Sequence, residues 1–144
     1  MPVQPIPEGF HTLTPYIIVE GALELVDFLK QVFDAKEVEL VKLPDGALMH
    51  AELLVGTSML MLGDAHGTHP IVNAMLYAYV EDVDAIYKRA IEAGAISVRE
   101  PRDEFYGDRT GGVKDKWGNQ WWFATHIEDL THEEIMRRGE EMQK

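Results

Sequence analysis

The stretch Met75-Leu76-Tyr77-Ala78-Tyr79-Val80-Glu81-Asp82 repeats the pattern of Leu13-Thr14-Pro15-Tyr16-Ile17-Ile18-Val19-Glu20-Gly21. In both, an apolar strand-like run ends in Val-Glu and a turn residue, so that Val80-Glu81 corresponds to Val19-Glu20. A helix-like segment follows each run, over residues 22–35 and 83–95, and further strand-like runs with a turn glycine complete each copy. The chain therefore reads as one β-α-β unit written twice. A chance likeness between two ordinary β-α-β stretches is the alternative.

Two copies are too few for an open solenoid, which needs about three or more repeats. We therefore expect the copies to cover each other's apolar faces around a shared concave cleft. Apolar residues recur at helical spacing in both helix-like segments, and Asp82 suits the N-cap of the second. Thr131 and Glu134 have capping-box spacing. This spacing predicts a third helix over about residues 131–143, at the surface or against a partner chain.

Composition limits the class of protein. The chain has 144 residues, of which 46% are hydrophobic and 26% charged, which fits one compact domain. It has no cysteine, which excludes disulfides and a thiol nucleophile. The net charge of −12 disfavours nucleic-acid binding, which depends on Lys and Arg. We see neither an apolar run long enough to cross a membrane nor a secretion-signal pattern, so we expect a cytoplasmic protein without membrane contact.

Several short motifs, taken together, resemble one superfamily. They are Phe10 to Tyr16, Val32 to Ala35, Met49 to Leu53, Met61 to Asp64, Phe105 to Arg109, Asp115, Gly118, Trp121 and Thr125-His126. In these motifs the chain resembles the vicinal-oxygen-chelate superfamily (glyoxalase, bleomycin-resistance and extradiol-dioxygenase proteins), and within it the PhnB-like branch. The resemblance implies an α+β fold of two tandem βαβββ modules that form a curled mixed sheet with a cleft, helices outside. It places module one at about residues 10–63, module two at about 73–126 and both in one domain, residues 1–144. It also implies a homodimer.

Enzymes of this superfamily hold a divalent metal through His or Glu side chains from the first and last strand of each module. Counted from the repeated Val-Glu and from the turn glycines Gly56 and Gly118, these four positions fall on Thr14, Leu60, Met75 and Trp122. None supplies the imidazole or carboxylate that such a site needs. The sequence therefore predicts no metal and no other cofactor. Asp64, His66 and His69 are a second metal candidate, although a solvated linker explains them better.

Strand alternation predicts which side chains line the cleft. Met49, Ala51 and Leu53 are expected to pack under the helices, which turns His50 and Glu52 toward the cleft. By the same period, Trp121 belongs to the core and Trp122 to the cleft. The predicted ligand-binding residues are Thr14, Tyr16, Leu60, Met75, Tyr77, Tyr79, Tyr106, Arg109, Gln120 and Trp122.

Two parts of this prediction have structural alternatives. The cleft side chains could fill the space themselves as a second core, and His50 could be a buried histidine hydrogen-bonded to Glu52 or to a main-chain carbonyl. The segment 104–109 reads as a loop over the cleft mouth, in which Arg109 clamps an anionic group with Tyr106 beside it. A salt bridge from Arg109 to Asp108 or Glu104 is the alternative.

Three functions remain open from the sequence. The first is a metal-free protein that binds an aromatic or amphipathic small molecule in an aromatic, Met-rich cleft. The second is a metal-free enzyme in which His50 is the catalytic base, Glu52 orients it and Arg109 stabilises negative charge. The third is a metal-dependent lyase, isomerase or dioxygenase, which the missing ligands disfavour.

Overall fold

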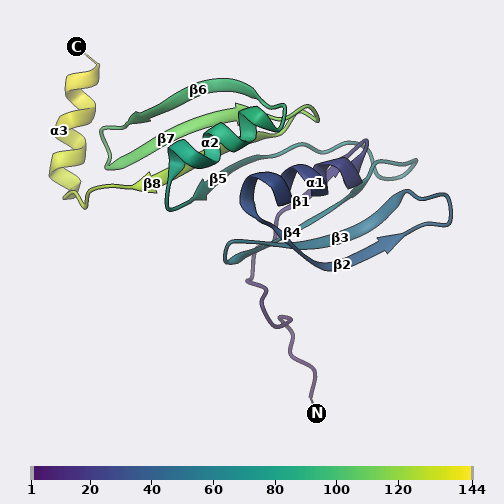
Figure 1. Cartoon of the computed structure of the whole chain (residues 1–144). Coiled ribbons are helices and arrows are strands. Elements are labelled where there is room, and N and C mark those ends of the chain that lie inside the picture. Colours follow the sequence, from purple (N-terminus) through teal and green to yellow (C-terminus); the bar gives the residue numbers. More distant parts are fainter. Residues whose placement is uncertain (1, 144) are drawn as a thin grey trace. The chain divides into compact units, whose positions relative to one another are not determined.

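A computed structural model describes residues 2–143 of the chain. It divides into two compact units at the boundary between Ala74 and Met75, and each unit is described by itself (Figure 1). The first unit contains β1 (Tyr16–Val19), α1 (Ala22–Phe33), β2 (Lys36–Lys42), β3 (Leu48–Val55) and β4 (Ser58–Asp64). The second contains β5 (Met75–Tyr79), α2 (Val83–Glu92), β6 (Ile96–Asp103), β7 (Asp108–Lys114), β8 (Gln120–His126) and α3 (His132–Met142).

The two units have the same sheet topology, which confirms the predicted pair of βαβββ modules. Strand order is β1-β4-β3-β2 in the first sheet and β5-β8-β7-β6 in the second. In each, the first strand pairs in parallel with the last, and the other neighbours are antiparallel. Tyr16 lies opposite Met61, and Tyr77 lies opposite Trp122. Tyr77 and Trp122 are therefore the equivalents of Tyr16 and Met61. Each equivalent pair has the same sequence separation as Val19 and Val80.

Helices α1 and α2 each pack on one face of their own sheet, and the core lies between helix and sheet. In the second unit Val113, Trp121 and Phe123 are at most 2% exposed. They alternate with side chains that point to the other face, as the two-residue period of a strand requires. Trp121 also donates its indole N–H to the buried carboxylate of Asp115, at 2.8 Å. The prediction that Trp121 belongs to the core is confirmed.

A side chain from the last strand of each sheet caps the neighbouring helix. In the first unit one carboxylate oxygen of Asp64 accepts the backbone N–H groups of Gly21 and Ala22, at 3.0 and 2.8 Å. Its other oxygen accepts the N–H of Leu48 at 2.7 Å. In the second unit Thr125, the residue equivalent to Asp64, accepts the N–H of Val83 at 3.0 Å. These contacts satisfy N–H groups that have no partner within the helix.

Replacing Asp64 with Ala should remove three hydrogen bonds that hold α1, β3 and β4 together. We expect the free energy of unfolding to fall by about 2–4 kcal/mol, since hydrogen bonds to a charged group contribute about 1.5–3 kcal/mol each and partial exposure weakens them. Asp45→Ala, which removes a single exposed turn bond to Ala47, is the control and should cost under about 1 kcal/mol. Urea unfolding measures both variants. Equal losses would contradict the capping role of Asp64.

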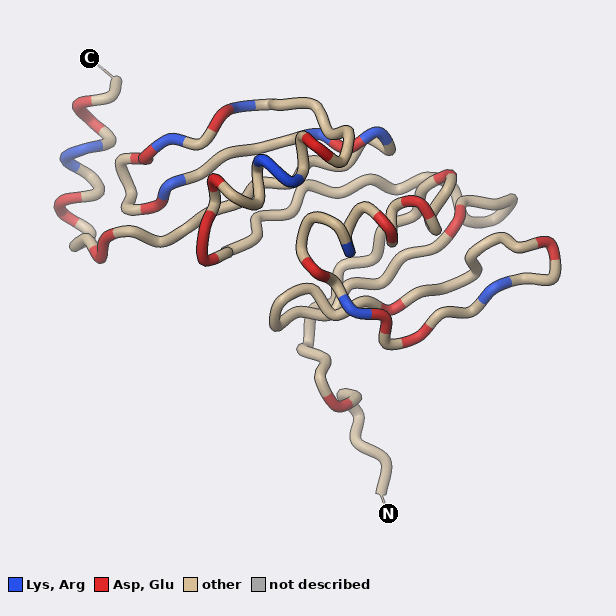
Figure 2. Tube along the Cα trace, viewed as in Figure 1, with Lys and Arg blue, Asp and Glu red and all other residues tan. Residues whose placement is uncertain are grey.

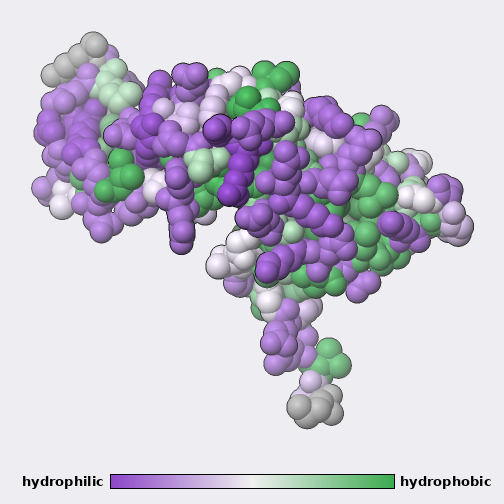
Figure 3. Space-filling view, viewed as in Figure 1, coloured by the Kyte–Doolittle hydropathy of each residue, from purple (hydrophilic) through white to green (hydrophobic). Residues whose placement is uncertain are grey.

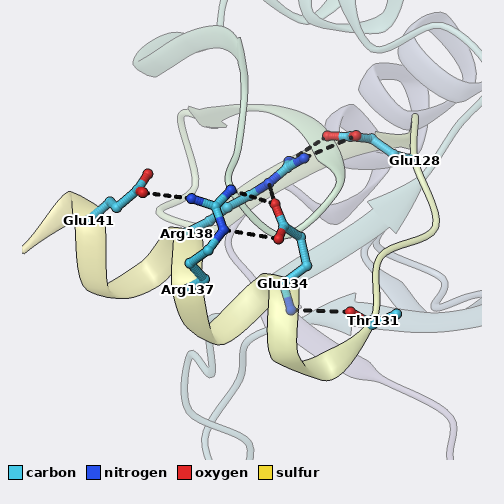
Figure 4. Close-up of polar contacts among 6 residues, drawn as sticks. All are labelled: Glu128, Thr131, Glu134, Arg137, Arg138 and Glu141. Atoms are coloured by element: carbon cyan, nitrogen blue, oxygen red, sulfur yellow. Dashed lines mark hydrogen bonds and ion pairs between the residues drawn. The ribbon is translucent and has the colours of Figure 1, made fainter.

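The third helix begins at the predicted cap. Thr131 accepts the N–H of Glu134 at 3.1 Å, and the Glu134 carboxylate binds Arg137 and Arg138 instead of turning back to Thr131 (Figure 4). These two guanidinium groups lower the pKa of Glu134 to about 2. Arg138 also binds Glu128, before the helix. Acidic and basic residues alternate along α3 (Figure 2), and α3 has no buried residue among those described.

Apolar side chains also reach the surface. Figure 3 shows hydrophobic residues over the β2–β3 hairpin, where Val38 and Met49 are more than half exposed. The prediction that Met49 packs under the helices is therefore wrong. The β2–β3 pairing passes from His50 to Leu48 at an irregularity, so the alternation shifts there and Leu48 is buried instead. A hollow of about 700 Å³ lies beside α3, bordered by Phe105, Met136 and Met142. No helix within residues 2–143 has the length and hydrophobicity needed to cross a bilayer.

Candidate ligand-binding site

The face of the second sheet opposite α2, here called the far face, carries exposed aromatic and methionine side chains. Met75, Tyr77 and Tyr79 alternate along β5 and are 65%, 44% and 66% exposed. The Tyr77 and Tyr79 rings meet edge to face, with centroids 5.4 Å apart. Gln120 and Trp122 lie opposite Met75 and Tyr77 on β8. The five predicted ligand-binding residues on these two strands therefore share one face.

Trp122 lies flat against the far face because Gly112, opposite it on β7, has no side chain. A Cβ at Gly112 would come within 2.7 Å of the Trp122 ring. The guanidinium of Arg99 lies 5.0 Å from the ring centroid, close enough for a cation–π contact. The Trp122 indole N–H donates to the side chain of Gln120 at 3.1 Å. These contacts fix the position of the Trp122 ring against the sheet, and the ring is still partly exposed.

Asp108 is the polar centre of the far face. It is 3% exposed. One oxygen accepts the hydroxyl protons of Tyr77 and Tyr79, at 2.8 and 2.9 Å, and the other contacts His126 Nδ1 at 2.8 Å. The Tyr106 hydroxyl is 3.4 Å from that of Tyr77. Strand register explains the histidine contact, since Asp108 and His126 lie directly opposite each other on β7 and β8.

The titration of this cluster follows from its contacts. Burial would raise the pKa of the Asp108 carboxyl, but the hydrogen bonds from His126, Tyr77 and Tyr79 overcome that effect and lower the pKa. The contact with Asp108, and a second one with Asp129, raise the pKa of His126. Burial and the hydrogen bonds to Tyr106 and Asp108 raise the pKa of Tyr77, which therefore stays a donor. The cluster is a buried carboxylate held by three donors.

Gly107 positions the segment that follows His126. Its carbonyl accepts the N–H groups of Ile127 and Glu128, at 2.8 and 3.1 Å. A Cβ at Gly107 would come within 2.5 Å of the Glu128 carbonyl oxygen, and its φ of 100° already favours glycine. Glycine at this position lets the loop between β6 and β7 lie against the end of β8, whose last residue is His126.

Stability should depend on pH through His126. Because the folded-state pKa is raised, the imidazolium stabilises the fold fully below the unfolded value of about 6.5, and this stabilisation is lost as pH rises through the folded pKa. Asp108 has the opposite sign, so its stabilisation is lost only in acid, as pH falls below about 3.9 through the lowered folded pKa.

The pH test compares the free energies of unfolding of the wild type, His126→Gln and the exposed control His11→Gln at pH 6, 7 and 8. We expect the deficit of His126→Gln to shrink as pH rises, because only the wild type loses the imidazolium contribution. The difference between wild type and His11→Gln is the control for replacing a histidine elsewhere on the surface, and it should be smaller than that for His126→Gln at pH 6. A deficit of His126→Gln that does not change with pH would contradict the assigned contacts.

The first unit contains a separate polar chain on the face of its sheet opposite α1. The Tyr16 hydroxyl is 3.1 Å from His50 Nδ1, and His50 Nε2 is 3.0 Å from a carboxylate oxygen of Glu52. Both side chains on β3 are about one quarter exposed. The structure thus brings together the proposed base and its orienting carboxylate, and Tyr16 occupies the other ring nitrogen. Thr14 lies just before β1 and not in it.

The predicted position of Leu60 is wrong. Leu60 pairs with Leu53, and both are buried on the α1 side of the first sheet. The strand position equivalent to Trp122 is Met61, opposite Tyr16. The error in Leu60 comes from counting forward from the turn glycines Gly56 and Gly118 as if they were equivalent. The β3–β4 turn holds two residues between the paired Val55 and Ser58, whereas the β7–β8 turn holds the five residues 115–119.

The predicted placement of Arg109 is also wrong. Arg109 lies within β7, one residue after Asp108, so alternation turns it to the α2 side. Its guanidinium makes two contacts of 2.9 Å with Asp84 on α2 and one of 3.1 Å with Asp103. Neither pairing considered from the sequence, with Asp108 or with Glu104, occurs in these contacts. Arg109 joins helix to sheet, and Tyr106 remains in the loop beside Tyr77.

The structure does not favour either metal candidate. With the corrected register, the four superfamily positions carry Thr14, Met61, Met75 and Trp122, which do not fit a site for a hard divalent ion. Asp64 uses its carboxylate to cap α1. The rings of His66 and His69 lie against each other, 4.5 Å apart. Within residues 2–143, no group of three or more His, Cys, Asp or Glu is placed to hold a metal ion.

Sequence reasoning missed Asp108, His126 and Asp129 as parts of the site. Asp108 entered the sequence analysis only within the motif Phe105 to Arg109 and as a possible partner of Arg109, and His126 only within the motif Thr125-His126. Their common role depends on the β7–β8 register, which the five-residue turn obscures. His126 Nε2 contacts the carboxylate of Asp129 at 2.8 Å. The available signal was a polar residue at the start of β7 and another at the end of β8, which come together when the two strands pair antiparallel.

Comparison with known proteins identifies the family. The model of the glyoxalase/bleomycin resistance protein/dioxygenase superfamily matches residues 10–123. The chain belongs to this superfamily. An uncharacterized protein of Mycobacterium bovis is 33% identical over 137 residues, which span 85% of this chain and 88% of that protein. An uncharacterized protein of Mycobacterium tuberculosis is also 33% identical over 137 residues, and that alignment covers 85% of this chain and 79% of the mycobacterial protein.

Solved structures of superfamily proteins share the fold. TioX from Micromonospora sp. ML1 has a TM-score of 0.67 at 25% identity, over 81% of this chain and 99% of that one. A PhnB protein from Bacillus cereus has a TM-score of 0.67 at 19% identity, over 80% and 99%. The fosfomycin resistance protein FosX from Mesorhizobium loti has a TM-score of 0.59 at 19% identity, over 91% and 99%. The last two likenesses concern the fold alone.

Proposed function

We propose that this chain is a metal-free small-molecule-binding protein whose ligand, aromatic or amphipathic, lies on the far face of the second unit. The observation that carries the proposal is the aromatic row formed by the exposed rings of Tyr77 and Tyr79 and the partly exposed Trp122, beside a buried, fully engaged carboxylate. Exposed aromatic surface with few polar anchors suits a flat ligand. The rings are held by Gly112 and Asp108, so a ligand need not order them.

Superfamily membership supports ligand binding without naming the ligand. FosX is named for resistance to fosfomycin, and at 19% identity it shares the fold alone with this chain. The four superfamily metal positions lack suitable ligands here, which favours a binding role over metal-dependent chemistry. A thermal-shift screen of antibiotics, aromatic acids and thiol conjugates tests the proposal, because a ligand bound only by the folded state raises its melting temperature.

Trp122 should report a bound aromatic ligand. We expect Trp122→Phe to remove most of the ligand-induced change in tryptophan emission and to weaken binding by about 0.5–1.5 kcal/mol. Trp121→Phe is the matched control. It should lower the free energy of unfolding by about 1–3 kcal/mol, because Asp115 loses a buried donor, and should leave affinity nearly unchanged. A response carried by Trp121 would place the ligand elsewhere, and a screen without any responsive ligand would remove the basis of the proposal.

Metal content gives an independent test. Protein purified without chelator should contain well under one equivalent of zinc, nickel, manganese or iron per chain by elemental analysis. The reason is the donor set Thr14, Met61, Met75 and Trp122. A stoichiometric metal held by far-face residues would instead favour a metal-dependent lyase, isomerase or dioxygenase.

A second candidate function rests on the first unit. Glu52 orients His50, and the Tyr16 hydroxyl contacts the other ring nitrogen, so a proton could pass from Tyr16 to His50. This arrangement favours metal-free acid–base chemistry, in which Tyr16 faces the substrate. Mass spectrometry of each ligand from the screen tests it. Conversion by the wild type that is lost in His50→Gln would support catalysis, and unchanged ligand in all incubations would refute it.

A further inference from the structure

His126 contacts two carboxylates that differ sharply in burial. Its Nδ1 lies 2.8 Å from Asp108, whose side chain is 4% exposed, and its Nε2 lies 2.8 Å from Asp129, whose side chain is 100% exposed. The inner contact is fixed by strand register and by the two tyrosines that share the Asp108 carboxylate. The outer contact joins His126, the last residue of β8, to Asp129. Asp129 is three residues later, in a segment outside any helix or strand.

The outer contact is easily exchanged. An ion pair with a fully exposed partner is screened by water and contributes little to stability. The Asp129 side chain also has to be ordered to make the contact, and its release recovers that entropy. The buried Asp108 therefore fixes the imidazole through Nδ1. The Nε2–H on the solvent side donates to the weakly held carboxylate of Asp129.

We propose that His126 Nε2–H is the anchor for the oxyanion, a carboxylate or sulfonate, of an aromatic ligand on the far face, and that Asp129 is a built-in competitor for this donor. This inference rests on the proposed function. Asp129 shows that a carboxylate oxygen reaches Nε2 at hydrogen-bond distance. An incoming ligand replaces one carboxylate by another, so the imidazolium keeps a neutralising partner throughout.

The aromatic part of such a ligand has a surface to contact. Tyr77 connects the anchor to the indole, because its backbone lies opposite Trp122 while its hydroxyl reaches Asp108. Trp122 and His126 lie four residues apart on one face of β8, or about 13 Å at the usual strand rise. A fused-ring acid lying along Tyr77 thus starts at His126 and extends toward Trp122. In this proposal His126, and not Arg109 as predicted from the sequence, binds the anionic group of the ligand.

The charged groups around the anchor are known. Asp108 faces His126 from β7, Asp129 from the segment after β8, and the phenols of Tyr77 and Tyr79 lie behind Asp108. Glu128 lies two residues after His126, and Arg138 of α3 binds its carboxylate at 2.7 Å. Its charge is therefore already paired when a ligand arrives.

The experiment uses 1-naphthoate and its uncharged analogue 1-naphthamide, with dissociation constants from calorimetry and histidine ring shifts from NMR. We expect His126→Gln to weaken naphthoate binding about ten- to a hundredfold, as for loss of a charge-assisted hydrogen bond, and to change naphthamide binding less than about twofold. Asp129→Asn should strengthen naphthoate binding about two- to fivefold. Glu100→Gln, which removes an exposed charge elsewhere in the same unit, is the control and should have a smaller effect.

A measurement on the wild type guards against misfolded variants. The naphthoate affinity should fall as pH rises through the His126 titration followed in the same NMR spectra, whereas naphthamide affinity should not. The inference is overturned if naphthoate binding ignores His126, if Asp129→Asn behaves like Glu100→Gln, or if neither probe binds at millimolar concentration. Naphthoate binding with a Trp122 response but without any dependence on His126 would overturn this inference alone. The proposed function fails separately, when no ligand in the screen changes Trp122 emission.

Discussion

The buried carboxylate of Asp108 determines the arrangement of the far face. A buried carboxylate is costly unless its oxygens are engaged, and Asp108 has three donors within 2.9 Å. Its partners come from β5 and β8, so one residue of β7 joins three strands. Removing it would leave two phenols and an imidazole without their acceptor. The exposed rings of Tyr77 and Tyr79 and the outward nitrogen of His126 are all consequences of satisfying this one charge.

The two units of the duplicated fold satisfy the N-terminal N–H groups of their helices with different side chains. In both units a residue at the end of the last strand must satisfy the N-terminal N–H groups of the helix that follows the first strand. The first unit uses the Asp64 carboxylate and the second uses the Thr125 hydroxyl, with Asp82 as an additional cap. The units have diverged further on the faces opposite their helices. The first carries the chain from Tyr16 through His50 to Glu52, and the second carries the Asp108 cluster.

Much of the fold could be predicted because it depends on local patterns. The repeat, the helix stripes and the Asp82 and Thr131 caps are read from neighbouring residues, and alternation separates Trp121 from Trp122. What failed depends on lengths and registers that pattern alone does not show. Leu60 was misplaced by one residue because the two hairpin turns differ in length. Arg109 was assigned to a loop, whereas β7 begins at Asp108, and one step along a strand reverses the side on which a residue lies. Asp108 and His126 are far apart in the sequence, so their contact could be seen only once β7 and β8 were paired.

We propose that the far face of the second unit holds an aromatic small molecule. NMR of the three tryptophan indole N–H groups, in protein titrated with a ligand from the screen, tests this site most directly. We expect the Trp122 signal, assigned with Trp122→Phe, to shift progressively to saturation at the same concentration as the His126 ring signals, while the Trp121 signal stays in place. Saturable binding that moves Trp121 or Trp117 and leaves Trp122 unchanged would contradict a ligand site on the far face.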